Sequence, residues 1–145
     1  MAVHVVRQKP SVSLRAWSPD DAEHLVHNAN HRSVWRNLGD IFPQPYTRDD
    51  ARAWFEHVRE PGRDLHFAIE FEGVAVGGIG VTAGSDIARQ TGRLGYWLGP
   101  EYWGRGIATA AVRELLEQVQ AQRLFARLEA AVFALRGKSK EELYT

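Results

Sequence analysis

A glycine-spaced segment in the C-terminal half carries the clearest chemical signal in the sequence. Gly104 to Thr109, "GRGIAT", joins a strand-like stretch to a long amphipathic one. A loop that enters a helix N-terminus presents backbone N–H groups without intrahelical partners, and with the helix dipole these favour a phosphate or another anion. Gly104 and Gly106 let the backbone turn sharply and approach a ligand closely. Arg105 adds positive charge and Thr109 a hydroxyl donor. We expect a phosphate-bearing ligand here, and a tight turn that binds nothing is the alternative.

Two common nucleotide-binding fingerprints fit this chain poorly. The dinucleotide pattern G-x-G-x-x-G has Thr109 in place of its third glycine. A P-loop at Gly137-Lys138-Ser139 would need a glycine where Val132 stands. A nucleotide-binding regulatory domain is therefore disfavoured.

Composition limits the class of protein. The chain has 145 residues, 44% of them hydrophobic, which suits one domain spanning residues 1–145. Its 18 Lys and Arg balance 18 Asp and Glu, so it has no global basic field for nucleic acid. The lack of cysteine excludes disulfides, thiolate metal ligands and cysteine nucleophiles. With no membrane-length apolar run and no signal-peptide core at the N-terminus, we expect a cytoplasmic protein.

Hydrophobic periodicity and capping signals predict a mixed α/β (α+β) fold. Strands are expected at Val3–Arg7, Val12–Arg15, Leu65–Glu70, Val74–Val81, Arg93–Leu98 and Arg127–Leu135. Helices are expected from the Ser18 N-cap to Asn30, over Val34–Leu38, from Thr47 to Val58, and over Ile107–Arg123. The third and fourth strands form a hairpin around Phe71-Glu72-Gly73. The last two strands flank a helix, and such βαβ units have parallel strands.

The segment Leu94–Leu116, "LGYWLGPEYWGRGIATAAVRELL", resembles the cofactor segment of the GNAT superfamily of acyl-CoA N-acyltransferases, in particular the branch of ribosomal-protein N-terminal acetyltransferases. The superfamily loop Q/R-x-x-G-x-G/A corresponds to Trp103–Ala108, with Trp in the first place. Four other pieces agree in order: "LRAWSPDDAEHL", "PYTRDDARAWF", "FAIEFEGVAVGGIGV" and "RLEAAVFA". The resemblance covers roughly residues 14–134 and implies a largely antiparallel sheet with a central parallel βαβ cofactor unit.

The resemblance also implies the ligand, acetyl-CoA, and the residues that hold it. In such proteins the strand before the loop bulges and splays from the next parallel strand, and the pantetheine arm pairs there with backbone near Tyr96, Trp97 and Leu98. The pyrophosphate would sit on the backbone N–H groups of Gly104, Arg105, Gly106, Ile107, Ala108 and Thr109. Ser139 stands at a retained cofactor position, and no metal is expected.

The implied reaction is attack of an amine on the acetyl thioester, which needs a proton acceptor and donors for the oxyanion. The strand N–H near Tyr96 is expected to polarise the carbonyl, and Tyr96 or Tyr102 to protonate the thiolate; packing is the alternative for both rings. Candidate bases are Glu70, Glu72, Asp86, Glu101 and Glu129, each with the alternative of a solvated surface carboxylate. The resemblance places Trp35, Phe42 and Tyr46 at the acceptor pocket, with core packing as an alternative for Trp35.

Three histidines, His24, His27 and His31, have spacings that place them on one helix face. A metal site usually needs a fourth ligand and oriented imidazoles. We interpret this face as polar surface.

The end of the sequence departs from the family pattern. Arg136 replaces the usual Asn, and the helix and two strands that normally follow do not appear before Thr145. This would expose the strand Arg127–Leu135 as a sheet edge, so a homodimer or homo-oligomer is expected to cover it. The function expected is an N-acetyltransferase acting on a protein N-terminal or small-molecule amine. The alternative is a non-catalytic acyl-CoA-binding or interaction module.

Overall fold

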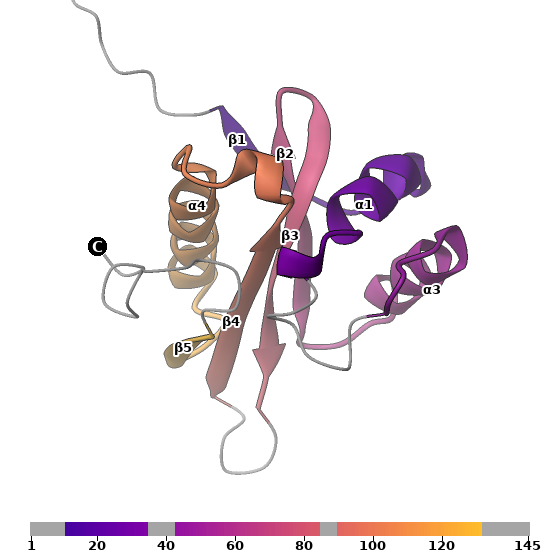
Figure 1. The fold of residues 1–145 in the computed structure, drawn as a ribbon. Coiled ribbons are helices and arrows are strands. Elements are labelled where there is room, and N and C mark those ends of the chain that lie inside the picture. The colour runs from indigo at the N-terminus through magenta and orange to yellow at the C-terminus, as the bar shows by residue number, and fades with distance from the viewer. Residues whose placement is uncertain (1–10, 35–42, 85–89, 132–145) are drawn as a thin grey trace, which may run out of the picture.

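A single five-stranded sheet organises the chain, in the order β1-β2-β3-β4-β5. The computed structural model describes residues 11–34, 43–84 and 90–131 (Figure 1). The strands are β1 Val12–Arg15, β2 Leu65–Phe71, β3 Val74–Ala83, β4 Thr91–Leu98 and β5 Arg127–Ala131. Neighbours are antiparallel except β4 and β5, which run parallel. The predicted fold class and the predicted parallel pair are both confirmed.

Helices cover both faces of the sheet (Figure 1). They are α1 Ala22–Ala29, α3 Arg48–Val58 and α4 Ile107–Gln122, with short 3-10 turns η1 Pro19–Asp21 and η4 Pro100–Tyr102. The α4 helix packs on one face, and α1 and α3 pack together on the other. Loop 99–106 therefore joins the end of β4 to the start of α4.

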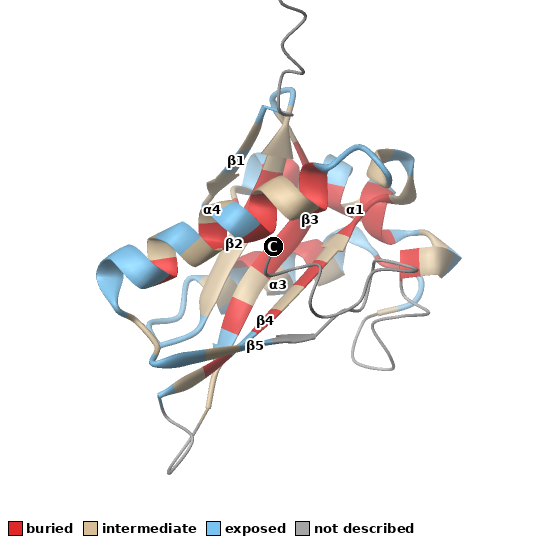
Figure 2. Cartoon of the chain, turned by 90° about the vertical axis from the view of Figure 1, so that its left-hand side faces the viewer, coloured by how far each residue is buried: buried red, intermediate tan, exposed pale blue. Residues whose placement is uncertain are grey.

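Strand alternation divides the core into two clusters. Leu94, Tyr96 and Leu98 of β4 face the buried stripe of α4. On the other face, Trp17 and Phe55 pack with small residues of β2 and β3 beneath α1 and α3. Figure 2 shows the resulting stripes on α4, with buried positions toward the sheet and exposed positions toward solvent. Trp97 points the opposite way from Tyr96 and contacts both clusters.

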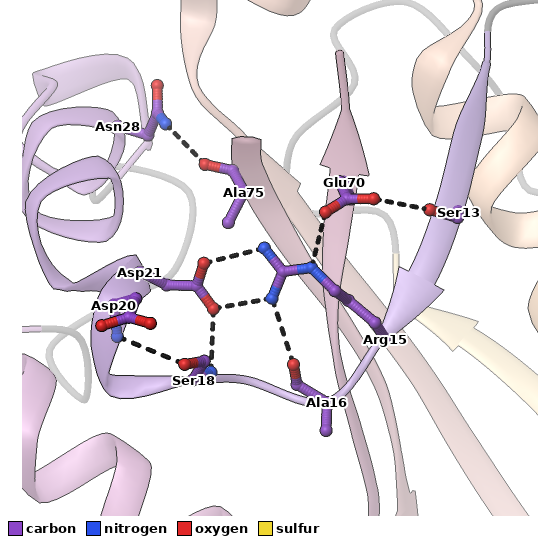
Figure 3. A network of polar contacts seen from close by, with 9 residues as sticks. All are labelled: Ser13, Arg15, Ala16, Ser18, Asp20, Asp21, Asn28, Glu70 and Ala75. Atoms are coloured by element: carbon purple, nitrogen blue, oxygen red, sulfur yellow. Dashed lines mark hydrogen bonds and ion pairs between the residues drawn. The ribbon is translucent and has the colours of Figure 1, made fainter. Parts of the chain in front are cut away.

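The start of the first helix is held by a capping box and an ion pair (Figure 3). Ser18 caps the turn as predicted, and Asp21 returns a hydrogen bond by accepting from the Ser18 backbone N–H at 2.8 Å. Asp21 also accepts two hydrogen bonds from Arg15 of β1. The Arg15 Nε donates to Glu70 of β2 at 2.8 Å. The network thus ties β1, β2 and the first helix together.

The observed boundaries refine several predictions. Phe71 belongs to β2 and pairs with Val74, so the predicted three-residue hairpin turn is a two-residue turn. Glu72 and Gly73 both have positive φ, +52° and +84°, which is the type I′ geometry that matches strand twist. Thr47 and Asp50 form a full capping box for α3. The helix α4 ends at Gln122 because Arg123 adopts a left-handed conformation.

A bulge lies between β2 and β3, and none lies between β3 and β4. Ile69 is opposite Gly77 while Glu70 is opposite Ala75, so Val76 is an extra residue on β3. From Gly92 to Leu98, β4 pairs with β3 without a register shift. The bulge expected at Tyr96 is therefore absent from the described β3–β4 ladder.

Some predictions fall on residues outside the described ranges. These are the strand Val3–Arg7, most of the helix Val34–Leu38, the last part of the strand Arg127–Leu135, and the chain end that carries Ser139. The dimer expected at β5 involves this region and remains a prediction. Among the described residues, none of the helices is both long and apolar enough to span a membrane.

Candidate functional site

The loop before α4 has the geometry expected of an anion-binding helix start. Gly104 and Gly106 have φ of +74° and +79°, in the left-handed region that favours glycine. Gly106 is the N-cap of α4, and it has no side chain that could cap the helix. The first helical bond runs from the Ala110 N–H to the Gly106 carbonyl at 3.1 Å, so Ile107 and Ala108 lie in the turn whose N–H groups have no intrahelical acceptor. This arrangement fits a pyrophosphate.

Two contacts fix the loop against the rest of the fold. The Trp103 indole donates to the Leu98 carbonyl at 2.9 Å, which folds the loop back over the end of β4. Tyr102 packs edge-on against Phe71, and the Arg105 guanidinium lies over the Tyr102 ring at 5.5 Å. Arg105 is exposed and belongs to the loop itself. The loop is thus held in place by aromatic side chains while its glycines stay open to solvent.

The backbone of β4 offers a second set of polar groups. The Gly99 N–H donates to Val76 of β3, so strand alternation turns the N–H and carbonyl of Leu98 and Tyr96 toward the β5 side. In the part of β5 that the structure describes, the pairing with β4 runs from Thr91 to Gly95, and the residues after Ala131 lie outside the described ranges. The Leu98 carbonyl accepts from Trp103, whereas the Leu98 side chain is buried in the core. This side of β4 is where the predicted pantetheine contacts would lie.

The side chain of Tyr96 is in the core beneath α4. The residue is 3% exposed, and its hydroxyl has no partner among the described residues. Burial raises the pKa of the Tyr96 phenol above its usual value, so it stays protonated. The Tyr96 phenol is therefore protonated and its hydroxyl makes no hydrogen bond to a described residue. The ring is surrounded by the apolar side chains of the core.

On the opposite face of the sheet, glycines leave a hollow of about 240 Å³. Its floor includes Gly80 and Gly95, which lie directly opposite each other on β3 and β4. Its walls include Trp54 of α3, His66 of β2 and Trp97 of β4. A Cβ at Gly95 would meet nothing within 4 Å, whereas one at Gly80 would lie 2.3 Å from the Leu65 carbonyl oxygen. The hollow is therefore open above Gly95.

His66 is the titratable side chain that lines this hollow. It pairs with Gly80, which pairs with Gly95, so the three residues form one row across the sheet. The His66 ring stacks edge-on against Trp54 at 5.1 Å and lies 5.6 Å from the His57 ring. Burial lowers the pKa of His66; the Asp64 carboxylate opposes this shift and His57 adds to it. The imidazole is thus kept neutral near pH 7 and can accept a proton.

His66 was not among the site residues expected from the sequence. Its strand position was predicted, but its neighbours across the sheet depend on register. The alternation of His66 with Phe67 and the run of glycines in β3 were the available signals.

The predicted carboxylate bases that the structure describes do not line this hollow. Glu70 is bound to Arg15 and Ser13, and the Arg15 hydrogen bond lowers the pKa of its carboxyl. Glu72 is exposed at the hairpin turn. Glu129 lies 3.8 Å from Arg127 on β5, and Glu101 pairs with His27 at 2.9 Å. Asp86 lies outside the described residues.

Of the three predicted acceptor residues, the structure describes Tyr46. Tyr46 is 6% exposed and packs in the cluster beneath α1 and α3, while its backbone N–H donates to the Asn30 side chain. Burial raises the pKa of its phenol. Trp35 and Phe42 lie outside the described residues. Tyr46 thus has the surroundings of a core residue.

The sequence matches the acetyltransferase (GNAT) domain over residues 11–136. The chain therefore belongs to the GNAT acetyltransferase family, and the predicted resemblance is confirmed. No curated protein sequence matches this chain.

Several solved acetyltransferases share the fold. RimJ of Mycobacterium smegmatis, in complex with a CoA disulfide, superposes with a TM-score of 0.70 and is 24% identical, over 90% of this chain and 66% of that one. RimL, a ribosomal alpha-N-protein acetyltransferase in complex with coenzyme A, superposes with a TM-score of 0.68 and is 19% identical, over 81% of this chain and 68% of that one. The microcin self-immunity acetyltransferase MccE, in complex with acetyl-CoA and AMP, superposes with a TM-score of 0.65 and is 22% identical, over 81% of this chain and 67% of that one. The chain thus spans about two thirds of each of these proteins.

Proposed function

We propose that this protein is an N-acetyltransferase that transfers the acetyl group of acetyl-CoA to a primary amine. The observation that carries the proposal is Gly106, whose left-handed backbone opens the uncapped first turn of α4 in a chain of the GNAT family. Backbone N–H groups at this turn would hold the pyrophosphate, and Arg105 would add positive charge. The backbone N–H and carbonyl of Tyr96, which point toward the β5 side of β4, would hold the pantetheine arm. When bound, acetyl-CoA supplies the acyl thioester.

The hollow over Gly95 is the proposed entry for the amine. Its backbone floor belongs to the same stretch of β4 as Tyr96, on the face away from α4. Adjacent strands lie about 4.8 Å apart, so the backbones of His66 and Gly95 are roughly 10 Å apart across Gly80. An imidazole reaching inward can take a proton from an amine above Gly95, directly or through one water. In this role His66 accepts the ammonium proton, and the freed nitrogen lone pair attacks the acyl carbon. The carbon–sulfur bond of the thioester then breaks, and the departing thiolate takes up the second proton lost by the nitrogen.

The rings around the hollow favour an acceptor with an apolar or aromatic group next to its amine. Trp54 and Trp97 offer faces that attract both apolar groups and an ammonium. A protein N-terminal α-amine, with a pKa near 8, loses its proton more easily than a lysine. RimL is named for α-amine acetylation and shares the fold, so N-terminal peptides are the first acceptors to test.

Calorimetric titration with acetyl-CoA tests the cofactor site. The variants Gly106→Asn and Gly106→Asp have the same shape, both tolerate the left-handed conformation and both cap helices. They differ by one negative charge at the proposed pyrophosphate position. We expect wild type and Gly106→Asn to bind and Gly106→Asp to bind at least tenfold more weakly. Equal binding by both variants would place the phosphates elsewhere.

An assay of turnover decides whether this protein is an N-acetyltransferase or a non-catalytic acyl-CoA-binding module. Release of coenzyme A in the presence of peptides with free N-termini is the expected result. Saturable acetyl-CoA binding without turnover on peptide or small-molecule amines would favour an acyl-CoA-binding module instead. The dimer remains part of the proposal, with the β5 edge as its contact, and a monodisperse monomer in light scattering would count against it.

A further inference from the structure

Three ligand-type side chains meet at the junction of α1 and η4. His27 lies in the last turn of α1, His31 follows one turn later, and Glu101 comes from η4. The His27 Nε2 lies 2.9 Å from the Glu101 Oε1. One ligand atom from each of the three residues lies within 4.8 Å of the other two. The sequence pattern had grouped His24 with the two histidines, but the structure puts Glu101 in its place.

This geometry is close to what a metal ion needs. In tetrahedral zinc sites the bonds to His and Glu are about 2.0–2.2 Å long, so ligand atoms lie ~3.4 Å apart. The separations of up to 4.8 Å would have to shrink by up to about 1.4 Å, and the 2.9 Å between His27 and Glu101 would have to widen by about 0.5 Å. The side chains of His27 and Glu101 are 64% and 55% exposed, so rotamer changes can supply both shifts. Two imidazoles with one carboxylate also favour a transition metal over Mg²⁺ or Ca²⁺.

A buried ring nitrogen of His31 also points to a ligand at this cluster. Its Nε2 is buried and has no hydrogen-bond partner among the described residues. Its ring stands edge-on to that of His27 with centroids 5.8 Å apart. A buried polar nitrogen without a partner costs free energy. A bound ion that orders both imidazoles would offset this cost if Nε2 is the ligand atom.

The two elements are already in contact beside the cluster. Asn28 of α1 donates to the Ala75 carbonyl at 3.1 Å. A Cβ at Gly99, just before η4, would lie 2.4 Å from the Asn28 Oδ1. An ion at the cluster therefore requires no movement of α1 toward the loop.

We propose that His27, His31 and Glu101 form a binding site for one Zn²⁺ or similar transition-metal ion, with water in the remaining position. The ion would fasten the end of α1 to the segment that leads into the cofactor loop. The site is independent of the proposed acetyl transfer, because none of its residues lines the hollow or the first turn of α4.

The test is a Zn²⁺ titration of untagged, metal-free protein by calorimetry, with His31→Gln and Glu101→Gln as site variants. The matched control is His24→Gln, which removes a histidine of the same helix outside the cluster. We expect one equivalent of Zn²⁺ to bind wild type and the control, and each site variant to lose at least tenfold in affinity. We also expect Co²⁺ to give the visible absorption of a four-coordinate site in wild type and not in His31→Gln. No saturable binding, or binding unchanged in both site variants, would overturn the proposal.

A second readout distinguishes this site from the cofactor site. Acetyl-CoA binding to the metal-free protein depends on the proposed function alone. We expect Zn²⁺ to raise the Tm of wild type and of His24→Gln and to leave that of Glu101→Gln unchanged. A rise of equal size in Glu101→Gln would also count against the cluster.

Discussion

The guanidinium of Arg15 donates two parallel hydrogen bonds to the carboxylate of Asp21, each 2.8 Å long (Figure 3). Asp21 is a buried charged residue, with 7% of its side chain exposed. Burial would by itself raise the pKa of its carboxyl, but the Arg15 and Ser18 hydrogen bonds outweigh this and lower it. The pair joins β1 to the start of the first helix.

Breaking a buried ion pair costs about 3–5 kcal/mol, and the cost is smaller here because Arg15 is partly solvated. We therefore expect Asp21→Asn to lower the free energy of unfolding by roughly 2–3 kcal/mol. Urea denaturation measures this loss. Asp20→Asn is the control on the same turn and should change stability by less than about 0.5 kcal/mol. Similar losses in both variants would show that the helix dipole, and not the ion pair, carries the effect.

The same pair predicts a dependence of stability on pH. The pKa of the Asp21 carboxyl is lower in the folded protein than in the unfolded chain. Its contribution to the free energy of unfolding is therefore fully present above a pH of about 3.8. It is lost as the pH falls below that value and through the folded-state pKa. The wild-type free energy of unfolding should therefore fall more steeply below pH 4 than that of Asp21→Asn. Parallel curves for the two proteins would contradict the assignment.

Gly95 and Gly80 predict opposite results for the same substitution. Gly95→Ala places a methyl group in open space, so stability should be unchanged or slightly higher. The methyl narrows the hollow, and we expect KM for the amine to rise about tenfold with acetyl-CoA binding unchanged. Gly80→Ala drives its Cβ against the Leu65 carbonyl and should destabilise the sheet. Thermal unfolding of both variants and steady-state kinetics of the first check this contrast.

His66 predicts a defined pH profile for turnover. If His66 accepts the proton, kcat/KM should fall as the pH drops through its pKa, which lies below the usual 6.5. His66→Gln should lower kcat by about 100-fold and remove this acidic limb. His57→Gln, at the exposed neighbour, should change kcat by less than about threefold. An unchanged pH profile in His66→Gln would assign the proton to another acceptor.

Tyr96→Phe tests the unpaired hydroxyl in the core. Removing a buried polar group without a partner should raise the free energy of unfolding by roughly 1 kcal/mol. Urea denaturation without ligand measures this, and calorimetry then reports whether acetyl-CoA binding changes. A loss of stability would show that the hydroxyl has a partner in solution.

Local signals let the sequence determine much of this protein by itself. The N-caps at Ser18 and Thr47, the apolar stripe of α4 and the glycines at 104 and 106 act within a few residues of their own positions. The order of elements, the parallel pair and the glycine-containing turn before α4 were therefore predictable. The hairpin turn was misplaced by one residue because the sequence pattern did not specify a type I′ turn at Glu72-Gly73.

Tertiary structure decided which distant residues meet. His66 faces Gly95 because of the register across β3, and Glu101 meets His27 although 74 positions separate them. Asp21 follows the predicted Ser18 N-cap, and the packing of β1 against the first helix makes it the partner of Arg15. Such pairings depend on strand register and on how helices dock on the sheet. These are set by burial of the whole core, so no short stretch of sequence specifies them.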